Sequence, residues 1–572
     1  GGMDRLDAMW RGVTGARGDY EAACRAARHQ ILSGDLAAEL REMQRRAGAA
    51  LEEAGQSLPE ETLRAALREM LVAFPRYRSY IDDEGATAED EALLAQTVAE
   101  AGARLDDTRI LDAVHRLLLS PAGPAGEAVL RRFQQVTGAV VAKAQEDTAF
   151  YRHTRCLAEA EVGSEPDAPP LSPGAFEAWC NDRLQHWPGA LALGSSHDTK
   201  RAEDARARLI ALTHRPECAA ILWQDAEALD TPHPPDTSTG WYVLQSALAL
   251  WEPDRDDLEE RLAAHLEKAL REAKEVTQWH DPDEAAEAQA GDFARAMLAD
   301  WRTNAPDALR ELVRVGECLS LTQLALRCMI PGVPDIYQGT ETGLFALTDP
   351  DNRAPLDPAA PVNIFGARKR ELLRELLSLR RRHREVFAHG ACRLEQDGDA
   401  LRLIREHGED AVVLRFARDG SILPEAFATP ATRPEDRGER IRLTGELPSP
   451  FNPPPGCSFN PRCPYANDRC RSERPLLKRH GASEGLLGRD VEAPDERPEV
   501  DLLAACNHTF EQLHRDLLQL AQQRVDLLHR CARLEVVEQR VVEPAAAGGE
   551  PCRLALQIHH APEVGREPLE VL

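Results

Sequence analysis

Apolar residues recur three and four positions apart along residues 1 to about 150, a stretch rich in Ala, Arg, Glu and Leu and poor in Gly. This is the spacing of one buried helix face, so the stretch is predicted to form several packed helices. Pro75 ends one of them, and the Pro-rich segment 164–174 predicts a loop before the next helix. The clearest example of the spacing is the set Leu63, Leu67, Met70, Leu71 and Phe74.

A different pattern begins near residue 186. The apolar run Ala190 to Leu193 ends in the polar stretch GSSHDTKR, and a helical pattern starts at Glu203. The same order returns at 315–345, and a helical region, 255–312, lies between the two. Strand, polar loop and helix form a βα unit, and in a (β/α)₈ barrel such loops carry the catalytic groups.

Residues 392–416 alternate between apolar and polar, with DGD and HGED as turn signals, which predicts a small antiparallel β element. Residues 422–465 are rich in Pro, and 509–541 show an uninterrupted helical pattern. That helix has a heptad seam, so it either forms a coiled-coil homodimer through 513–541 or packs on its own domain. The seam consists of Leu513, Leu517, Leu520, Leu527, Cys531, Leu534 and Val541, with Arg524 and Glu538 interrupting it.

The composition of the chain limits the kinds of partner that it is expected to bind. The chain of 572 residues carries 69 Lys and Arg against 96 Asp and Glu, a formal charge of −27, which repels nucleic acid and anionic lipid. It contains no apolar run of about 18 residues and no signal-like N-terminus, so we expect a cytoplasmic protein without a membrane span. Its 13 cysteines are mostly scattered, as in a reducing compartment.

Five motifs stand in a fixed order in the middle of the chain: SSHDTKRAEDARARL, LQSALALWEP, KALREAKEVTQW, PGVPDIYQGTE and TDPDNRAPLD. Together they closely resemble the C-terminal half of malto-oligosyltrehalose synthase, a family of the α-amylase superfamily. DAMWRGVTGARGDYEAACRAARHQIL and LVAFPRYRSYI resemble the helical insertion of that family. The resemblance covers about residues 4–420.

The resemblance implies an isomerase that moves the reducing-end glucose of a maltodextrin from an α-1,4 to an α,α-1,1 linkage within the same chain. One carboxylate attacks the anomeric carbon and another exchanges a proton, through an oxocarbenium-like transition state. Asp198 matches a third carboxylate, which stabilises the distorted sugar, and His197 matches a histidine that contacts the sugar. By itself a His-Asp pair in a loop is more typical of a surface turn or a helix cap.

Four further residues are expected to contact the substrate by the same resemblance: Lys200, Arg201, Lys274 and Arg353. The alternatives are solvent-exposed charge for the first two and a structural turn or salt bridge for Arg353, as also for Tyr77, Arg78 and Asp351. Trp251 and Trp279 could stack on sugars, but a buried Trp is more often part of the core. No cofactor is expected for the mutase chemistry.

Two elements of the family pattern are missing from the sequence. The nucleophilic aspartate of an Arg-x-Asp-His-x-Asp-Gly type motif and the acid glutamate precede the helical insertion in the family, and neither has a counterpart here. Loss of either removes several orders of magnitude in rate. The isolated chain is therefore expected to have little or no mutase activity, and the alternative is a non-catalytic carbohydrate-binding or interaction protein with a metal-stabilised tail.

A cysteine-containing block follows. The sequences RGERIRLTGELPSPFNPPPGCSFNPRCPYANDRC and LLAACNH resemble the C-terminal region of oligopeptide/dipeptide ABC-transporter ATPase subunits, across about 432–508. The resemblance implies a [4Fe–4S] cluster or Zn²⁺ on Cys457, Cys463, Cys470 and Cys506, and free reduced cysteines are the alternative. The sequence has no Gly-x₄-Gly-Lys-Ser/Thr loop, which excludes transport ATP hydrolysis, although a role as a regulatory subunit of a peptide transporter stays open.

The expected fold class is α/β: the C-terminal part of a (β/α)₈ barrel with a large helical insertion and a small antiparallel β element, followed by a Pro/Cys-rich segment and a long helix. The expected boundaries are listed in chain order. They are a helical insertion region (1–160), the barrel part with a helical insert (161–385), the start of a β domain (386–421), the transporter-like tail (422–508), and a C-terminal helix and tail (509–572).

Overall fold

The computed structural model describes residues 2–356, 361–398 and 400–417, together with three short strands at 477–480, 485–488 and 555–560. The chain divides into two compact units, the first made of residues 1–430 and 551–572 and the second of residues 431–550. Cys457, Cys463, Cys470, Cys506 and the predicted helix 509–541 lie outside the described residues. None of the described helices offers the long apolar stretch that crossing a bilayer requires.

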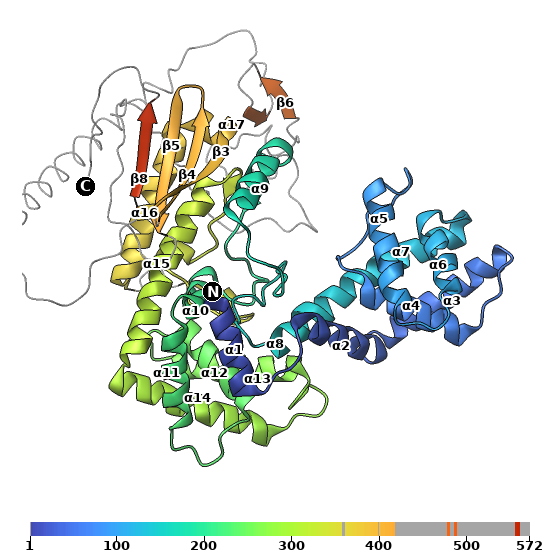
Figure 1. The fold of residues 1–572 in the computed structure, drawn as a ribbon, viewed down its shortest axis with the longest axis horizontal. Coiled ribbons are helices and arrows are strands. Elements are labelled where there is room, and N and C mark those ends of the chain that lie inside the picture. Colours follow the sequence, from blue (N-terminus) through green and yellow to red (C-terminus); the bar gives the residue numbers. More distant parts are fainter. Residues whose placement is uncertain are drawn as a thin grey trace, which may run out of the picture. The chain divides into compact units, whose positions relative to one another are not determined.

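The predicted helices of the N-terminal region are confirmed. Helices α2 to α7, the π-helix η1 and the short α8 follow one another in the chain (Figure 1). They share one apolar core. Leu63, Leu67 and Met70 are buried on one face of α4, and Pro75 follows its end. The bounds are α2 (Tyr20–Ser33), α3 (Ala37–Glu53), α4 (Glu60–Ala73), α5 (Ala88–Gly102), α6 (Arg109–Leu119), α7 (Gly123–Val140), η1 (Val141–Ala149) and α8 (Phe150–Arg152).

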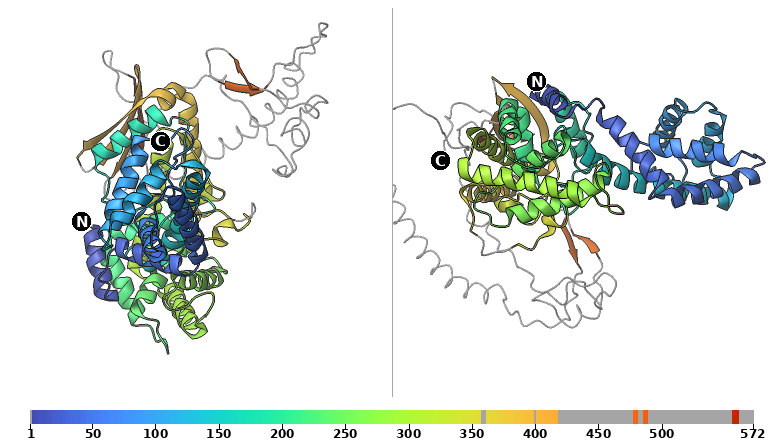
Figure 2. Two further views of the ribbon diagram at one scale, coloured as in Figure 1. Left: turned by 90° about the vertical axis from the view of Figure 1, so that its right-hand side faces the viewer. Right: turned by 90° about the horizontal axis from the view of Figure 1, so that it is seen from below.

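A second apolar core is built mainly from α1 and from helices α10 to α15. Helix α1 (Gly2–Thr14) buries Leu6 and Trp10 there rather than in the first core, and it lies against α10–α12 in Figures 1 and 2. The bounds are α9 (Pro173–His186), α10 (Glu203–His214), α11 (Pro216–Glu227), α12 (Thr237–Leu250), α13 (Leu258–Ala273), α14 (Glu284–Asn304), α15 (Asp307–Met329), α16 (Ile364–Arg382) and α17 (Arg384–His389).

The two predicted βα units meet in a small parallel sheet. Strand β1 (Leu191–Ala192) pairs with β2 (Val333–Pro334), with Leu191 opposite Val333. Each strand is only two residues long, shorter than the predicted apolar run 190–193. Leu191, Leu193 and Val333 are about half exposed or more, at 60%, 56% and 49%. A polar loop follows β1 and leads into α10, and two 3₁₀ turns follow β2, η2 (Thr340–Thr342) and η3 (Asp351–Arg353).

The predicted antiparallel element is confirmed as a meander of β3 (Ala391–Asp397), β4 (Ala400–His407) and β5 (Asp410–Ala417). Both predicted turns are present, and Gly398 and Gly408 adopt φ values of 60° and 61° there, which only glycine adopts readily. Strand β8 (Ala555–His560) pairs antiparallel with β5 on the outer side. The meander shares a core with α15, α16 and α17.

The described part of the second unit is one antiparallel pair of strands. Strand β6 (Leu477–His480) pairs with β7 (Gly485–Gly488), and Leu477 lies opposite Gly488.

Candidate functional site

The candidate site is centred on the loop 195–201 between β1 and α10, which we call the HD loop. Hydroxyl groups shape it from within: Ser195 Oγ accepts from the amide of Glu203 at 2.8 Å, and Ser196 Oγ accepts from the amide of Asp198 at 3.2 Å. The resulting turn directs His197 and Asp198 outward, where both side chains are more than half exposed and His197 Nε2 lies 3.3 Å from Asp198 Oδ2. These two groups are therefore free to meet a ligand.

The turn η3 supports the HD loop from one side. Asn352 Nδ2 donates to the carbonyl oxygens of His197 and Thr199 at 3.1 and 3.0 Å, and to that of Ser196 at 3.4 Å. The guanidinium of Arg353 lies 3.6 Å from Asp198 Oδ1 and 3.0 Å from Asp349 Oδ1. The structure thus brings Arg353, His197 and Asp198 together.

Asp351, in contrast, anchors η3 to the rest of the unit. Its carboxylate accepts from Arg261 at 2.7 and 3.0 Å and from the amide of Leu347 at 2.8 Å. A carboxylate bound to a guanidinium through both oxygens is held in one orientation. Asp351 therefore has the structural role that the sequence left open for it.

The π-helix η1 contributes a second group of polar side chains near Asp198. Tyr77, from the loop after α4, donates its hydroxyl to Glu146 Oε1. Burial and the neighbouring Glu146 raise the pKa of Tyr77, and the charge of Asp198 adds to this rise. Burial also raises the pKa of Glu146, against the opposing effects of its hydrogen bond with Tyr77 and the charge of Lys200. Segments of π-helix often mark functional sites.

Lys200 links the HD loop to η1. Its ammonium group is 2.7 Å from Asp147 Oδ1 and faces the ring of Tyr151 at 5.6 Å, and its side chain is almost fully buried. Lys143 approaches the other oxygen of Asp147 at 2.8 Å. Burial opposes ionisation of Asp147, but the two ammonium groups outweigh it and hold the pKa of this carboxyl below its ordinary value. Asp147 is therefore an ionised acceptor flanked by two cations.

Arg201 points the other way, into the protein. The residue is 1% exposed, and its guanidinium donates to the carbonyl of Ala160 at 2.8 Å and to the hydroxyl of Tyr242 at 3.2 Å. That hydroxyl also pairs with His265 Nε2 at 2.8 Å, and burial followed by the charge of Arg201 lowers the pKa of His265 well below its ordinary value. This interior position differs from the solvent-facing one that the predicted sugar contact requires.

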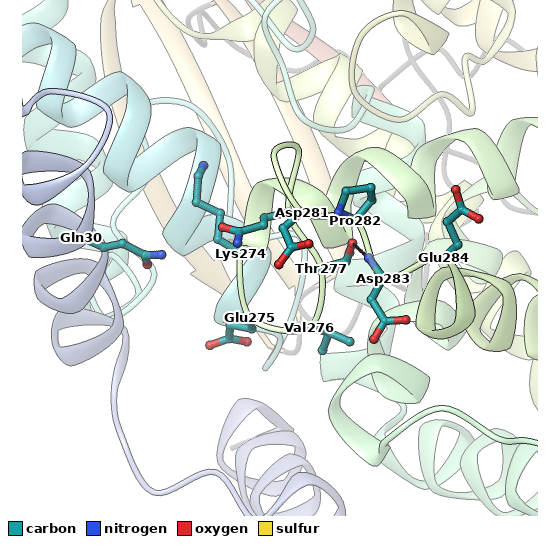
Figure 3. Close-up of a pocket in the computed structure, with 10 residues that line it drawn as sticks. Gln30, Lys274, Glu275, Val276, Thr277, Asp281, Pro282, Asp283 and Glu284 are labelled. Atoms are coloured by element: carbon teal, nitrogen blue, oxygen red, sulfur yellow. Dashed lines mark hydrogen bonds between the residues drawn. The ribbon is translucent and has the colours of Figure 1, made fainter.

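Lys274 lies at the edge of the site. It ends α13 in a left-handed conformation, with φ of 55°, and its ammonium group is 3.5 Å from Thr148 Oγ1 of η1. Beside it is a polar cavity of about 720 Å³, which the loop 275–283 encircles. Figure 3 shows Gln30 extending from α2 toward this loop, and the bond from the amide of Asp283 to Thr277 Oγ1, 2.9 Å long, which braces the loop. The structure thus places Lys274 between η1 and this cavity.

The two tryptophans that could stack on sugars, Trp251 and Trp279, differ in their exposure. Trp251 is buried in the second core, as a structural Trp is expected to be, whereas Trp279 is 48% exposed and donates to Glu272 at 3.1 Å. Among the residues that the structure describes, no group of three or more His, Cys, Asp or Glu could hold a metal ion.

Sequence reasoning missed three carboxylates of this region: Glu146 and Asp147 on η1, and Glu161, which contacts the backbone of the HD loop. A signal for Asp147 existed in its spacing of four residues from Lys143, which is that of a helical ion pair. Glu161 gave no local signal because its partners lie 39 and 40 residues away.

The arrangement suits a neutral, polyhydroxylated ligand. Exposed donors and acceptors of both kinds, His197, Asp198 and Arg353, converge at one place, and each can form hydrogen bonds with hydroxyl groups. A carboxylate at such a place can also stabilise positive charge that develops on a bound ligand.

Comparison with known proteins confirms both resemblances. A Mycobacterium tuberculosis chain named as a maltooligosyl trehalose synthase is 34% identical over 363 residues, 62% of this chain and 45% of that one. The solved maltooligosyltrehalose synthase of Arthrobacter ramosus aligns with a TM-score of 0.60 at 29% identity, covering 72% of this chain and 54% of that chain.

The later block matches a different family. Residues 426–470 match the family model for the C-terminal region of oligopeptide/dipeptide transporters. The dipeptide transport ATP-binding protein DppF of Haemophilus influenzae is 60% identical over 53 residues, 9% of this chain and 16% of that one. In all, the chain spans about half the length of the first group of relatives and a small part of the second.

Proposed function

We propose that residues 2–417 supply one half of an isomerase that converts the reducing-end α-1,4 linkage of a maltodextrin to α,α-1,1, giving maltooligosyl trehalose. The observation that carries the proposal is the exposed His197–Asp198 pair beside Arg353, in a chain whose relatives at 34% and 29% identity bear the name of that synthase. The sequence motifs and the geometry thus point to the same loop.

In this proposal Asp198 acts on the sugar ring. Cleavage of the glycosidic bond places positive charge on the anomeric carbon and ring oxygen, and a carboxylate that binds ring hydroxyls stabilises that state. His197 donates a hydrogen bond to a neighbouring hydroxyl, and Arg353 orients Asp198 from 3.6 Å. When the missing nucleophile and acid are supplied, the anomeric hydroxyl of the reducing-end glucose, rather than water, attacks the anomeric carbon in the second step and displaces the nucleophilic carboxylate.

We further infer that β1 and β2 are two neighbouring strands of a (β/α)₈ barrel. Their parallel pairing and the helices that follow them support this assignment. So does the exposure of Leu191, Leu193 and Val333, since apolar side chains on such strands are normally covered in a closed barrel. The nucleophile and the general acid have no counterpart in the sequence, so the described half is expected to bind maltodextrin but not to turn it over.

The test combines binding and turnover on the purified chain. Maltopentaose should bind in a calorimetric titration, and Asp198→Asn should weaken binding about tenfold, since a hydrogen bond to a charged group is worth about 1.5–3 kcal/mol. Asp182→Asn, on the exposed surface of α9, is the matched control and should bind like the parent chain. Reducing ends and free glucose, followed in parallel, should both stay constant. Absence of binding would overturn the proposal, and loss of reducing ends without glucose would show that the chain carries its own nucleophile and acid.

We also propose a metal site in the second unit, formed by Cys457, Cys463, Cys470 and Cys506. Support comes from the family match at 426–470, which includes the first three cysteines, and from the chemistry of four thiolates, which suits [4Fe–4S] or Zn²⁺. Elemental analysis of protein purified without oxygen should find either about four iron atoms with labile sulfide, or about one zinc ion, per chain. The variant with Cys457→Ser and Cys463→Ser should lose the metal, and a metal-free parent protein would contradict the proposal.

A further inference from the structure

We propose that Glu161 and Asn352 are positioning residues that clamp the backbone of the HD loop, one at its amides and the other at its carbonyls, and thereby set where His197 and Asp198 meet the sugar. Neither residue was singled out as a site residue by the sequence motifs. The part of the inference that concerns sugar binding rests on the proposed function, whereas the part that concerns the loop backbone does not.

Glu161 binds the amide side of the loop. Its Oε1 accepts from the amide of Lys200 at 2.7 Å, and its Oε2 accepts from the amide of Arg201 at 3.0 Å. Arg206, on α10, donates to the same Oε2 at 3.1 Å. A buried carboxylate that accepts several N–H bonds forms charge-assisted hydrogen bonds, which are about twice as strong as neutral ones.

Glu161 is itself fixed in place. It is 7% exposed, its own amide donates to Ser164 Oγ at 3.1 Å, and its Oε1 also accepts from the amide of Val162 at 2.8 Å. The carboxylate therefore reaches the HD loop from a braced turn and not from a freely rotating side chain. This is the property that a positioning group requires.

Asn352 binds the carbonyl side. It is 3% exposed. Its side-chain nitrogen donates to the carbonyl oxygens of His197 at 3.1 Å, Thr199 at 3.0 Å and Ser196 at 3.4 Å. Asp351, next to it, is bound to Arg261 through both oxygens, so η3 cannot shift without breaking that pair. Asn352 thus joins the loop to a rigid part of the unit.

The two clamps bracket the functional pair in the sequence. Asn352 holds the carbonyls of 196, 197 and 199, and Glu161 holds the amides of 200 and 201, so Asp198 lies between the fixed points. The side chains of His197 and Asp198 are exposed, and Asp198 pairs with His197 and with Arg353 rather than with the backbone of the loop. Their positions therefore depend on the clamped backbone.

The first test is amide hydrogen exchange on the full chain with Glu161→Gln. The side-chain amide of Gln retains one acceptor oxygen but presents N–H donors in place of the second, so exchange at the amide of Lys200, of Arg201 or of both should accelerate about tenfold or more. Glu159→Gln is the matched control, because Glu159 lies in the same segment and pairs with the side chain of Arg155 at 2.9 Å. Equal exchange rates in the two variants would overturn the clamp.

The second test is maltopentaose affinity at a temperature where all variants are folded. Glu161→Gln and Asn352→Leu should each weaken binding about fivefold or more, whereas Glu159→Gln should leave it unchanged. The ranking of the variants by melting temperature should differ from their ranking by affinity. Faster exchange with unchanged affinity would overturn the positioning role. If the parent chain binds no maltopentaose, the proposed function fails, and the exchange rates alone then decide whether the clamp exists.

Discussion

At the scale of single residues, Lys369 on α16 carries one of the fully buried charges of the first unit. It is fully buried, and its ammonium group lies 2.8 Å from Glu203 Oε1 and 2.6 and 2.8 Å from the oxygens of Asp204. Arg327 also binds Glu203, through both oxygens. The first turn of α10, directly after the HD loop, is therefore held by two cations from α15 and α16.

Removing Lys369 should strongly destabilise the chain. Lys369→Met leaves two carboxylates buried with one fewer cation, which typically costs about 3–5 kcal/mol of unfolding free energy. Urea unfolding measures the change, and Arg368→Met on the exposed side of the same helix should alter stability by less than about 0.5 kcal/mol. An equal effect of the two substitutions would show that the buried ion network contributes little.

The ion pairs of Glu203 with Lys369 and Arg327 predict that the folded chain loses stability in acid. Burial alone would raise the pKa of Glu203, but Lys369 and Arg327 outweigh it and lower the pKa to about 2, from an ordinary 4.5. A carboxyl whose pKa is lowered by folding stabilises the protein above pH 4.5, and that stability is lost as the pH falls toward 2. The difference in urea midpoint between the parent chain and Glu203→Gln should therefore shrink from pH 6 to pH 3. A difference independent of pH would contradict the ionised state of Glu203.

At the scale of elements, Arg405 joins the meander to the helices beneath it. It is fully buried on β4 and donates to four carbonyls: Met329 O at the end of α15, Val386 O and Phe387 O in α17, and Gly390 O before β3, at 2.7 to 3.2 Å. The last carbonyls of a helix have no partner within it, so one guanidinium satisfies several such groups at once.

Arg405→Met should cost about 3–5 kcal/mol of unfolding free energy, because it leaves several buried carbonyls without donors. Arg402→Met, on the same strand, removes an ion pair of 3.6 Å with Glu395 and should cost less than about 1 kcal/mol. Thermal unfolding followed by circular dichroism compares the two. The prediction fails if Arg405→Met melts within about 2 °C of Arg402→Met.

Helices, strands and turns could be predicted from the sequence where a local residue pattern alone determined them. The helical spacing of α4 and the glycine turns of the meander required no distant partner, and both are confirmed. The strand at 190–193 was predicted too long, because pairing with β2 extends over only two residues. The π-helix could not be predicted, since its hydrogen bonds change the register while the apolar spacing stays helical. Of the candidate site, the motifs directed attention to His197, Asp198 and Arg353, which the structure places together, but contacts to backbone across long separations left Glu161 undetected.

At the scale of the whole molecule, the first unit is discontinuous in the sequence. The first unit includes residues 551–572, and β8 from that segment extends the sheet that β3 to β5 begin. The second unit, residues 431–550, is thus an insertion between two parts of the first, and the transporter-like match at 426–470 lies across the first of its two borders. The two resemblances therefore meet close to a border between units.

The clamp on the HD loop also bears on how this site can change over generations. Glu161 and Asn352 hold main-chain amides and carbonyls, which every residue other than proline provides in the same form. Substitutions at 197 and 198 would therefore leave the frame intact while they alter the groups displayed on it. The loop is accordingly a place where new ligand preferences can be sampled, in evolution or in a mutant library, with little loss of foldability.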